Sequence, residues 1–145
     1  DLYQEVILDH NKRPRNFGQL KEPERSAEGY NPLCGDKLIV HLGLKGDVIC
    51  EIAFTGSGCA ISKASASLMT ESVKGKTLAE VRTLSARFQE MVTADAEIEP
   101  GTDALGKLSV FAGVRAYPAR VKCAVLAWHT LRAAIEAENK VATTE

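Results

Sequence analysis

Alternation of apolar and polar residues predicts two β-strands in the first half of the chain. Residues 37–44 and 47–55 show the period of two that is typical of a strand with one buried face. The Lys-Gly pair between them predicts a turn. On the second strand, the alternation places Cys50 on the same face as Ile52 and Phe54. We therefore expect Cys50 to be a buried and inert thiol.

Apolar residues at three- and four-residue spacing predict helices over much of the remaining chain. Their starts are expected at about Leu2, just after Cys59, at Thr77, at about Asp103 and near Pro118. The third start carries the Thr-x-x-Glu pattern of a capping box, and the last has a proline in its first turn. The segment that ends at Pro32 is rich in proline, glycine and charge, which predicts a loop. Strands in the first half and helices in the second indicate an α+β fold.

The composition is that of an ordinary globular protein. The chain has 145 residues, 45% of them hydrophobic and 26% charged, so we expect a single domain over residues 1–145. A formal net charge of −1 predicts no nucleic-acid partner and no anionic membrane surface. The apolar runs are too short to span a bilayer and no signal-peptide pattern is present, which favours a cytoplasmic protein. Because the first residue is Asp1 and not Met, we expect that residues precede it.

Three of the four cysteines fall in turns or near predicted helix starts. Cys34 follows Asn-Pro-Leu and precedes a glycine, Cys59 follows Gly-Ser-Gly, and Cys123 is close to the start of the last helix. Asp36 lies two residues after the first of them. Three thiolates and one carboxylate form a complete tetrahedral ligand set for Zn²⁺. The same thiolates are also suited to hold an iron–sulfur cluster or to accept sulfur.

The electrostatic surroundings favour ionised thiols at two of these positions. Free N–H groups at a helix N-terminus stabilise a thiolate, and we expect this effect at Cys59 and Cys123. Arg120 and Lys122 flank Cys123 and would offset the formal charge of −2 of a zinc with three thiolates and one carboxylate. The spacing alone does not separate a metal site from scattered buried cysteines or from a purely structural zinc. A carboxylate ligand favours a site that opens, since it is displaced more easily than a fourth thiolate.

Six motifs spread over nearly the whole chain carry a family resemblance. They are Leu8–His10, Lys12–Gly18, Asn31–Asp36, Phe54–Ser62, Ala64–Ser67 and Arg120–Cys123. On these motifs the chain resembles the IscU-like iron–sulfur cluster assembly proteins, and most closely their zinc-dependent SufU branch. The resemblance implies a SufE/IscU-like fold, with a small, mostly antiparallel three-stranded sheet packed against helices. It also implies metal ligation by Cys34, Asp36, Cys59 and Cys123.

Three departures from IscU point to the SufU branch. IscU has a histidine immediately before its third cysteine, where this chain has Lys122. IscU also has a Leu-Pro-Pro-Val-Lys chaperone motif, where this chain has Ala-Tyr-Pro-Ala-Arg at 116–120. The segment between Cys59 and Cys123 is longer than in IscU, as it is in SufU proteins.

Resemblance to SufU implies a sulfurtransferase that works with a PLP-dependent cysteine desulfurase of the SufS type. In that interpretation Cys34 takes the outer sulfur of the desulfurase persulfide while a desulfurase histidine replaces Cys34 on zinc. Arg120 is the candidate for orienting the site, and a downstream iron–sulfur scaffold receives the sulfur. Two alternatives stay open. In the first alternative, the chain is a scaffold that builds an iron–sulfur cluster on Cys34, Cys59 and Cys123. In the second, it is a zinc-stabilised adaptor that only binds the desulfurase.

Overall fold

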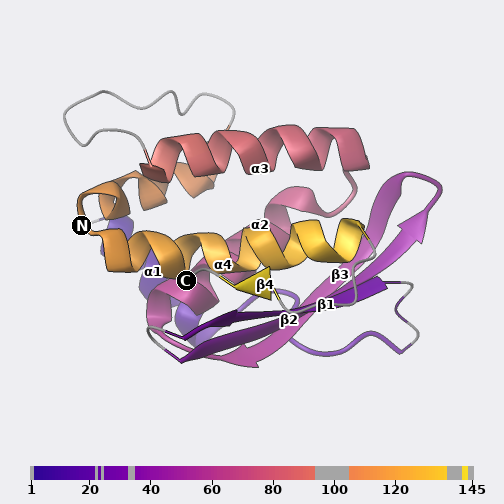
Figure 1. Ribbon diagram of the computed structural model, residues 1–145, viewed down its shortest axis with the longest axis horizontal. Coiled ribbons are helices and arrows are strands. Elements are labelled where there is room, and N and C mark those ends of the chain that lie inside the picture. Colours follow the sequence, from indigo (N-terminus) through magenta and orange to yellow (C-terminus); the bar gives the residue numbers. More distant parts are fainter. Residues whose placement is uncertain are drawn as a thin grey trace.

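The computed structural model describes residues 2–21, 23, 25–32, 35–93, 105–136 and 142–143. The elements are α1 (Leu2–Lys12), β1 (Arg25–Asn31), β2 (Asp36–Lys45), β3 (Val48–Ser57), α2 (Ala60–Val73), α3 (Leu78–Thr93), the 3₁₀ helix η1 (Gly106–Ala116), α4 (Pro118–Ile135) and β4 (Ala142–Thr143). Helix α4 packs on β1 and β2, and α2 packs on β3 and on α4. Figure 1 shows α4 lying between the sheet and α3.

The sheet confirms the predicted fold class. Strands β1, β2 and β3 are antiparallel neighbours, and within the described residues the strand order is β3-β2-β1-β4. The two-residue β4 adds a parallel edge beside Gly29 and Tyr30 of β1. The fold is therefore α+β, with a mostly antiparallel sheet packed against helices.

Strand β1 occupies a segment for which the sequence predicts a loop. Its buried positions are Ala27, Gly29 and Asn31, so the alternation is present but carries almost no large apolar residues. Small residues are needed because α4 crosses this strand closely. A Cβ atom at Gly29 would overlap the hydroxyl of Thr130 on α4. The strand is thus specified by packing against a distant helix and not by local β-propensity.

The prediction that Cys50 is buried is wrong, and a β-bulge is the reason. Strands β2 and β3 pair regularly as far as Gly43 opposite Glu51, after which Leu44 pairs with Ile49. Cys50 is therefore the extra residue of the bulge, and the alternation changes face there. Ile49 enters the core, whereas Cys50 is exposed and its thiol donates to the Gly43 carbonyl at 3.2 Å.

The predicted helices are largely confirmed. Helix α3 has the expected capping box: the Thr77 N–H donates to Glu80 Oε1 at 3.0 Å, and the Glu80 N–H donates to Thr77 Oγ1 at 3.2 Å. The Thr77 N–H and the Thr77 hydroxyl both donate to Glu80 Oε1, and these two hydrogen bonds lower the pKa of the Glu80 carboxyl. Pro118 begins α4, and Trp128 of the same helix is buried against Phe88. None of the described helices is long and apolar enough to cross a membrane.

One helix prediction is confirmed only for part of its length. A short helix is expected from about residue 103 to 114, and the structure has the 3₁₀ helix η1 from Gly106 to Ala116. Residues 94–104 lie outside the described part of the chain. The acidic, Gly/Pro-containing stretch before this helix therefore lies outside the described residues.

The segment after α1 ties the N-terminal part of the chain to α2 and β3. His10 is buried, and its Nδ1 lies 2.7 Å from Ser67 Oγ, which also accepts the Arg15 N–H at 2.8 Å. Burial lowers the pKa of His10, and the nearby Arg15 acts in the same direction. The chain then runs beside β3, where Asn16 and Gly18 exchange backbone hydrogen bonds with Phe54. His10 is thus a structural residue. The segment from Asn16 to Gly18 covers part of the β3 edge of the sheet.

Candidate metal centre

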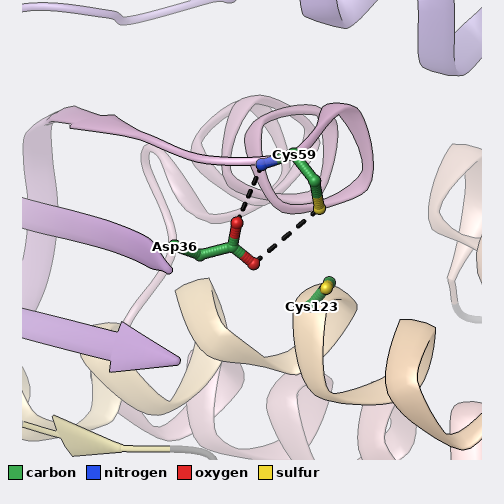
Figure 2. Close-up of side chains that lie close together, drawn as sticks. All are labelled: Asp36, Cys59 and Cys123. Atoms are coloured by element: carbon green, nitrogen blue, oxygen red, sulfur yellow. Dashed lines mark hydrogen bonds between the residues drawn. The ribbon is translucent and has the colours of Figure 1, made fainter. Parts of the chain in front are cut away.

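Three of the predicted metal ligands converge in the structure. One carboxylate oxygen of Asp36 and the sulfurs of Cys59 and Cys123 all lie within 4.8 Å of one another. They come from the start of β2, the N-terminus of α2 and the first half of α4. Figure 2 shows the Asp36 carboxylate and both sulfurs directed toward a common point. Residues that are far apart in the sequence therefore form one cluster.

Asp36 is fully buried and is held by the backbone of the neighbouring ligand. Its Oδ1 accepts the Cys59 N–H at 2.8 Å, and its Oδ2 accepts the Cys59 thiol at 3.7 Å. A Cβ atom at Gly58 would lie 2.6 Å from Asp36 Oδ1, which is too close for any real side chain. Gly58 is therefore required for this approach, because it lets the backbone contact the carboxylate.

Cys59 is the N-cap residue of α2, as the sequence predicts. Its sulfur accepts the Ser62 N–H at 3.4 Å, so the side chain caps the helix in the way that a serine or aspartate usually does. The side chain is partly exposed.

Cys123 is placed differently from its prediction. Helix α4 begins at Pro118, so Cys123 belongs to the second turn, beyond the free N–H groups of the helix start. Its side chain is 3% exposed, and the amide of Asn31 donates to its sulfur at 3.7 Å. Asn31 is the last residue of β1 and is itself fully buried. The expected stabilisation by a helix N-terminus is therefore replaced at Cys123 by a side-chain donor from the sheet.

The three side chains fit a zinc ion. Bonds of about 2.3 Å to sulfur and about 2.0–2.2 Å to oxygen place tetrahedral zinc ligands about 3.5–3.8 Å apart. Ligand atoms within 4.8 Å of one another are close to that arrangement. Two thiols and a carboxylate are also the donor types that zinc binds. A fourth ligand is needed, and Cys34, which the sequence predicts for this role, lies outside the described residues.

Three cationic side chains lie within four residues of a cluster cysteine along the chain. Arg120 is exposed, and its guanidinium carbon is 4.7 Å from the ring centroid of Tyr117, a geometry typical of a cation–π contact. Lys122 is half-buried, one position before Cys123. Lys63, one turn after Cys59, lies 5.2 Å from the ring centroid of Phe17.

Two residues beside the cluster were not predicted as part of the site. Asn31 belongs to a family motif, but its contact with Cys123 depends on a strand that the sequence does not predict. Ser62 contacts Cys59 through its N–H, while its hydroxyl is buried without a hydrogen-bond partner in the described part of the chain. The sequence signals for both residues are their places in family motifs and their positions within three residues of a predicted ligand.

Comparisons with known proteins show what the whole chain is similar to. The family model described as the NifU-like N terminal domain matches residues 2–124. The iron-sulfur cluster assembly scaffold protein IscU of Streptococcus pyogenes serotype M1 is 42% identical over 135 residues, which cover 93% of this chain and 83% of that protein. The zinc-dependent sulfurtransferase SufU of Bacillus subtilis (strain 168) is 39% identical, with 95% and 92% covered. The crystal structure of FiSufU from Fervidobacterium islandicum AW-1 has a TM-score of 0.85 at 35% identity, and the match covers 92% of this chain and 96% of that one.

Proposed function

The chain belongs to the NifU-like N-terminal domain family of IscU and SufU iron–sulfur cluster assembly proteins, and on that premise we propose that it is a zinc-dependent sulfurtransferase. It accepts sulfur from the persulfide of a PLP-dependent cysteine desulfurase of the SufS type and passes it to a downstream iron–sulfur scaffold. The observation that carries the proposal is the buried carboxylate of Asp36 between Cys59 and Cys123.

The ligand chemistry favours zinc over an iron–sulfur cluster. Clusters are held mainly by cysteine thiolates, whereas a mixed set of sulfur and oxygen ligands is common for zinc. The Cys59 N–H donates to the Asp36 carboxylate and holds it beside the two sulfurs, in a position suited to a metal ligand. Cys34 is the proposed fourth ligand. It lies two positions before Asp36 along the chain, which keeps the two Cα atoms within about 7 Å.

The contacts of two cysteines suit them to hold a metal. Cys123 is buried within α4 and contacts Asn31, and Cys59 is tied to the first turn of α2. Both are suited to keep the metal in place. We assign the role of sulfur acceptor to Cys34, because its sequence context, between a proline and a glycine, is typical of a turn that could let it leave the metal and return.

The transfer step is a thiol–persulfide exchange. Zinc, when bound, holds the cysteine side chains as thiolates. The Cys34 thiolate attacks the outer sulfur of the desulfurase persulfide, a new sulfur–sulfur bond forms, and the old one breaks. The desulfurase cysteine leaves as a thiolate and Cys34 keeps the transferred sulfur as a persulfide. No external oxidant or reductant is consumed.

Arg120 is the proposed orienting residue. It is exposed one turn before Cys123, and its contact with Tyr117 restricts the guanidinium to a few orientations. A cation at this position attracts an anionic persulfide that approaches from solvent. We therefore place Arg120 at the face where the desulfurase docks.

A scaffold function is the second candidate, because the relative from Streptococcus pyogenes is named an iron–sulfur cluster assembly scaffold protein. In that case Cys34, Cys59 and Cys123 would hold a cluster while it is assembled. The two functions differ in what the protein carries after incubation with a desulfurase. A sulfurtransferase carries a persulfide on one cysteine, whereas a scaffold carries iron and sulfide.

Mass spectrometry after incubation with a SufS-type desulfurase and cysteine tests the proposal. We expect a mass gain of about 32 Da, one sulfur atom, on the peptide that contains Cys34. The Cys34→Ser variant should accept no sulfur. Cys50→Ser is the matched control, since Cys50 is an exposed thiol outside the cluster, and it should accept sulfur as the parent does. Sulfur mapped to Cys59 or Cys123, with Cys34 left unmodified, would contradict the assignment.

A further inference from the structure

The hydroxyl of Ser62 is an unsatisfied polar group next to the proposed metal centre. Ser62 is fully buried, and its Oγ has no hydrogen-bond partner among the residues that the structure describes. The other buried hydroxyls of α2 are satisfied: Ser65 donates to the Ala124 carbonyl at 2.6 Å, Ser67 contacts His10, and Thr70 donates to the Ser67 carbonyl. A buried hydroxyl without a partner costs free energy, so its retention calls for an explanation.

The neighbouring capping geometry explains why this hydroxyl is left over. At the third position of a helix, a polar side chain commonly reaches back to the N–H of the N-cap residue, as Glu80 does toward Thr77 in α3. In α2 the corresponding N–H belongs to Cys59, and it is already donated to Asp36 Oδ1 at 2.8 Å. Ser62 therefore cannot make the usual capping contact, and its hydroxyl stays available.

The surroundings of Ser62 place it on the face of α2 that packs against α4. Residues three apart on a helix lie on the same face, and Ser65 on this face contacts Ala124, which directly follows Cys123. One turn in the other direction is Cys59, whose sulfur accepts the Ser62 N–H. Ser62 thus lies one turn after Cys59 and one turn before Ser65, whose hydroxyl contacts the residue next to Cys123.

We propose that Ser62 is a positioning residue of this metal centre, whose hydroxyl donates a hydrogen bond to the Cys123 sulfur when that sulfur is a metal-bound thiolate. The inference rests on the zinc centre of the proposed function. A thiolate accepts hydrogen bonds more strongly than a neutral thiol, and the Ser62 hydroxyl, which has no partner among the described residues, has no hydrogen bond to give up when it turns toward that thiolate. The N–H of Ser62 would then serve Cys59 and its hydroxyl would serve Cys123. Donors of this kind orient metal ligands and offset their charge.

Two serine-to-alanine variants separate this role from a purely structural one. Ser62→Ala removes a hydroxyl that has no partner, whereas Ser65→Ala removes one that bonds to the Ala124 carbonyl. The parent and both variants are purified anaerobically and stripped of metal. The affinity for Zn²⁺ is measured by competition with a chromophoric chelator, and the melting temperature is measured with and without Zn²⁺.

We expect Ser62→Ala to bind Zn²⁺ roughly 10-fold more weakly than the parent, the lower end of the range for outer-shell partners of metal ligands. Its metal-free melting temperature should equal or exceed that of the parent. Ser65→Ala should melt earlier both with and without metal and should keep the parent's affinity for Zn²⁺. Parent-like affinity in Ser62→Ala would overturn the inference, as would a metal-free melting temperature lowered as much as in Ser65→Ala.

The same proteins distinguish failure of the inference from failure of the proposed function. If the parent binds Zn²⁺ and Ser62→Ala weakens it, the inference stands even where no sulfur is accepted from the desulfurase. If sulfur transfer is observed but Ser62→Ala binds Zn²⁺ like the parent, the inference alone fails. A parent that binds no Zn²⁺ would overturn both.

Discussion

The geometry around Asp36 depends on single backbone groups. The Cys59 N–H donates to Oδ1 of the carboxylate, and Gly58 allows the chain to pass within contact distance of that same oxygen. Asn31 and Ser62 add polar groups next to the two sulfurs. Neighbours of this kind would orient the three side chains as metal ligands.

Cys50 lies outside this cluster, and two measurements test whether its side chain is exposed. Cys50→Ala should change the free energy of unfolding by less than about 0.5 kcal/mol, the usual range for an exposed position. In the metal-loaded parent, Cys50 should react first with an alkylating reagent, while Cys59 and Cys123 are protected. Peptide mapping after a short treatment measures this order. Slow alkylation of Cys50, or a large loss of stability in Cys50→Ala, would show that the thiol is buried after all.

Strand β1 and helix α4 form the contact that supports the buried side of the centre. The strand carries Asn31 at its end, and the helix carries Cys123. Their close packing depends on Gly29, where a Cβ atom would overlap the hydroxyl of Thr130 and lie 3.2 Å from Leu126 Cδ1. The helix and strand must therefore separate if Gly29 gains a side chain.

We expect Gly29→Ala to lower the free energy of unfolding by about 1–3 kcal/mol, the usual cost of overpacking a core. It should also weaken metal binding, because Asn31 and Cys123 would move apart. Gly43→Ala is the matched control: Gly43 is also a strand glycine, but an added Cβ would meet only the side chain of Glu51 at 3.2 Å and that of Cys50 at 3.8 Å. Urea denaturation of both variants measures the difference. Equal stability of Gly29→Ala and Gly43→Ala would contradict the close packing of β1 on α4.

The elements that could be predicted from the sequence are those that carry their own apolar pattern. Strands β2 and β3, the capping box at Thr77 and the start of α4 at Pro118 all have local signals. Strand β1 has no such local signal, because its buried residues are small where α4 packs closely against them. The burial of Cys50 was wrongly predicted because a bulge leaves no mark in the alternation.

The candidate site was predictable to a similar degree. The helix-start position of Cys59 follows from the chain alone. The convergence of Asp36, Cys59 and Cys123 does not, because it depends on how β2, α2 and α4 pack. The residue types indicated a possible ligand set, but only the family resemblance implied that they lie at one site. Neither the local sequence pattern nor the family resemblance predicted the contact of Asn31 with Cys123, since this contact requires the unpredicted strand β1.

Taken as one molecule, the protein places its candidate ligands where three packed elements meet. Helix α4 contacts the sheet and α2, so the ligands at the ends of these elements are held by the same core. A metal bound at this cluster would therefore be coupled to folding, because a ligand that binds the native state and not the unfolded chain stabilises the fold. Its identity would bear on both the function and the stability of the whole chain.

Elemental analysis of anaerobically purified protein decides whether this centre is a zinc site. We expect one zinc per chain, little iron and no acid-labile sulfide. The same zinc content is expected in Cys50→Ala, since Cys50 lies outside the cluster. Iron and sulfide bound together in place of zinc would instead identify a cluster scaffold, and a chain purified without bound metal would contradict the zinc centre itself.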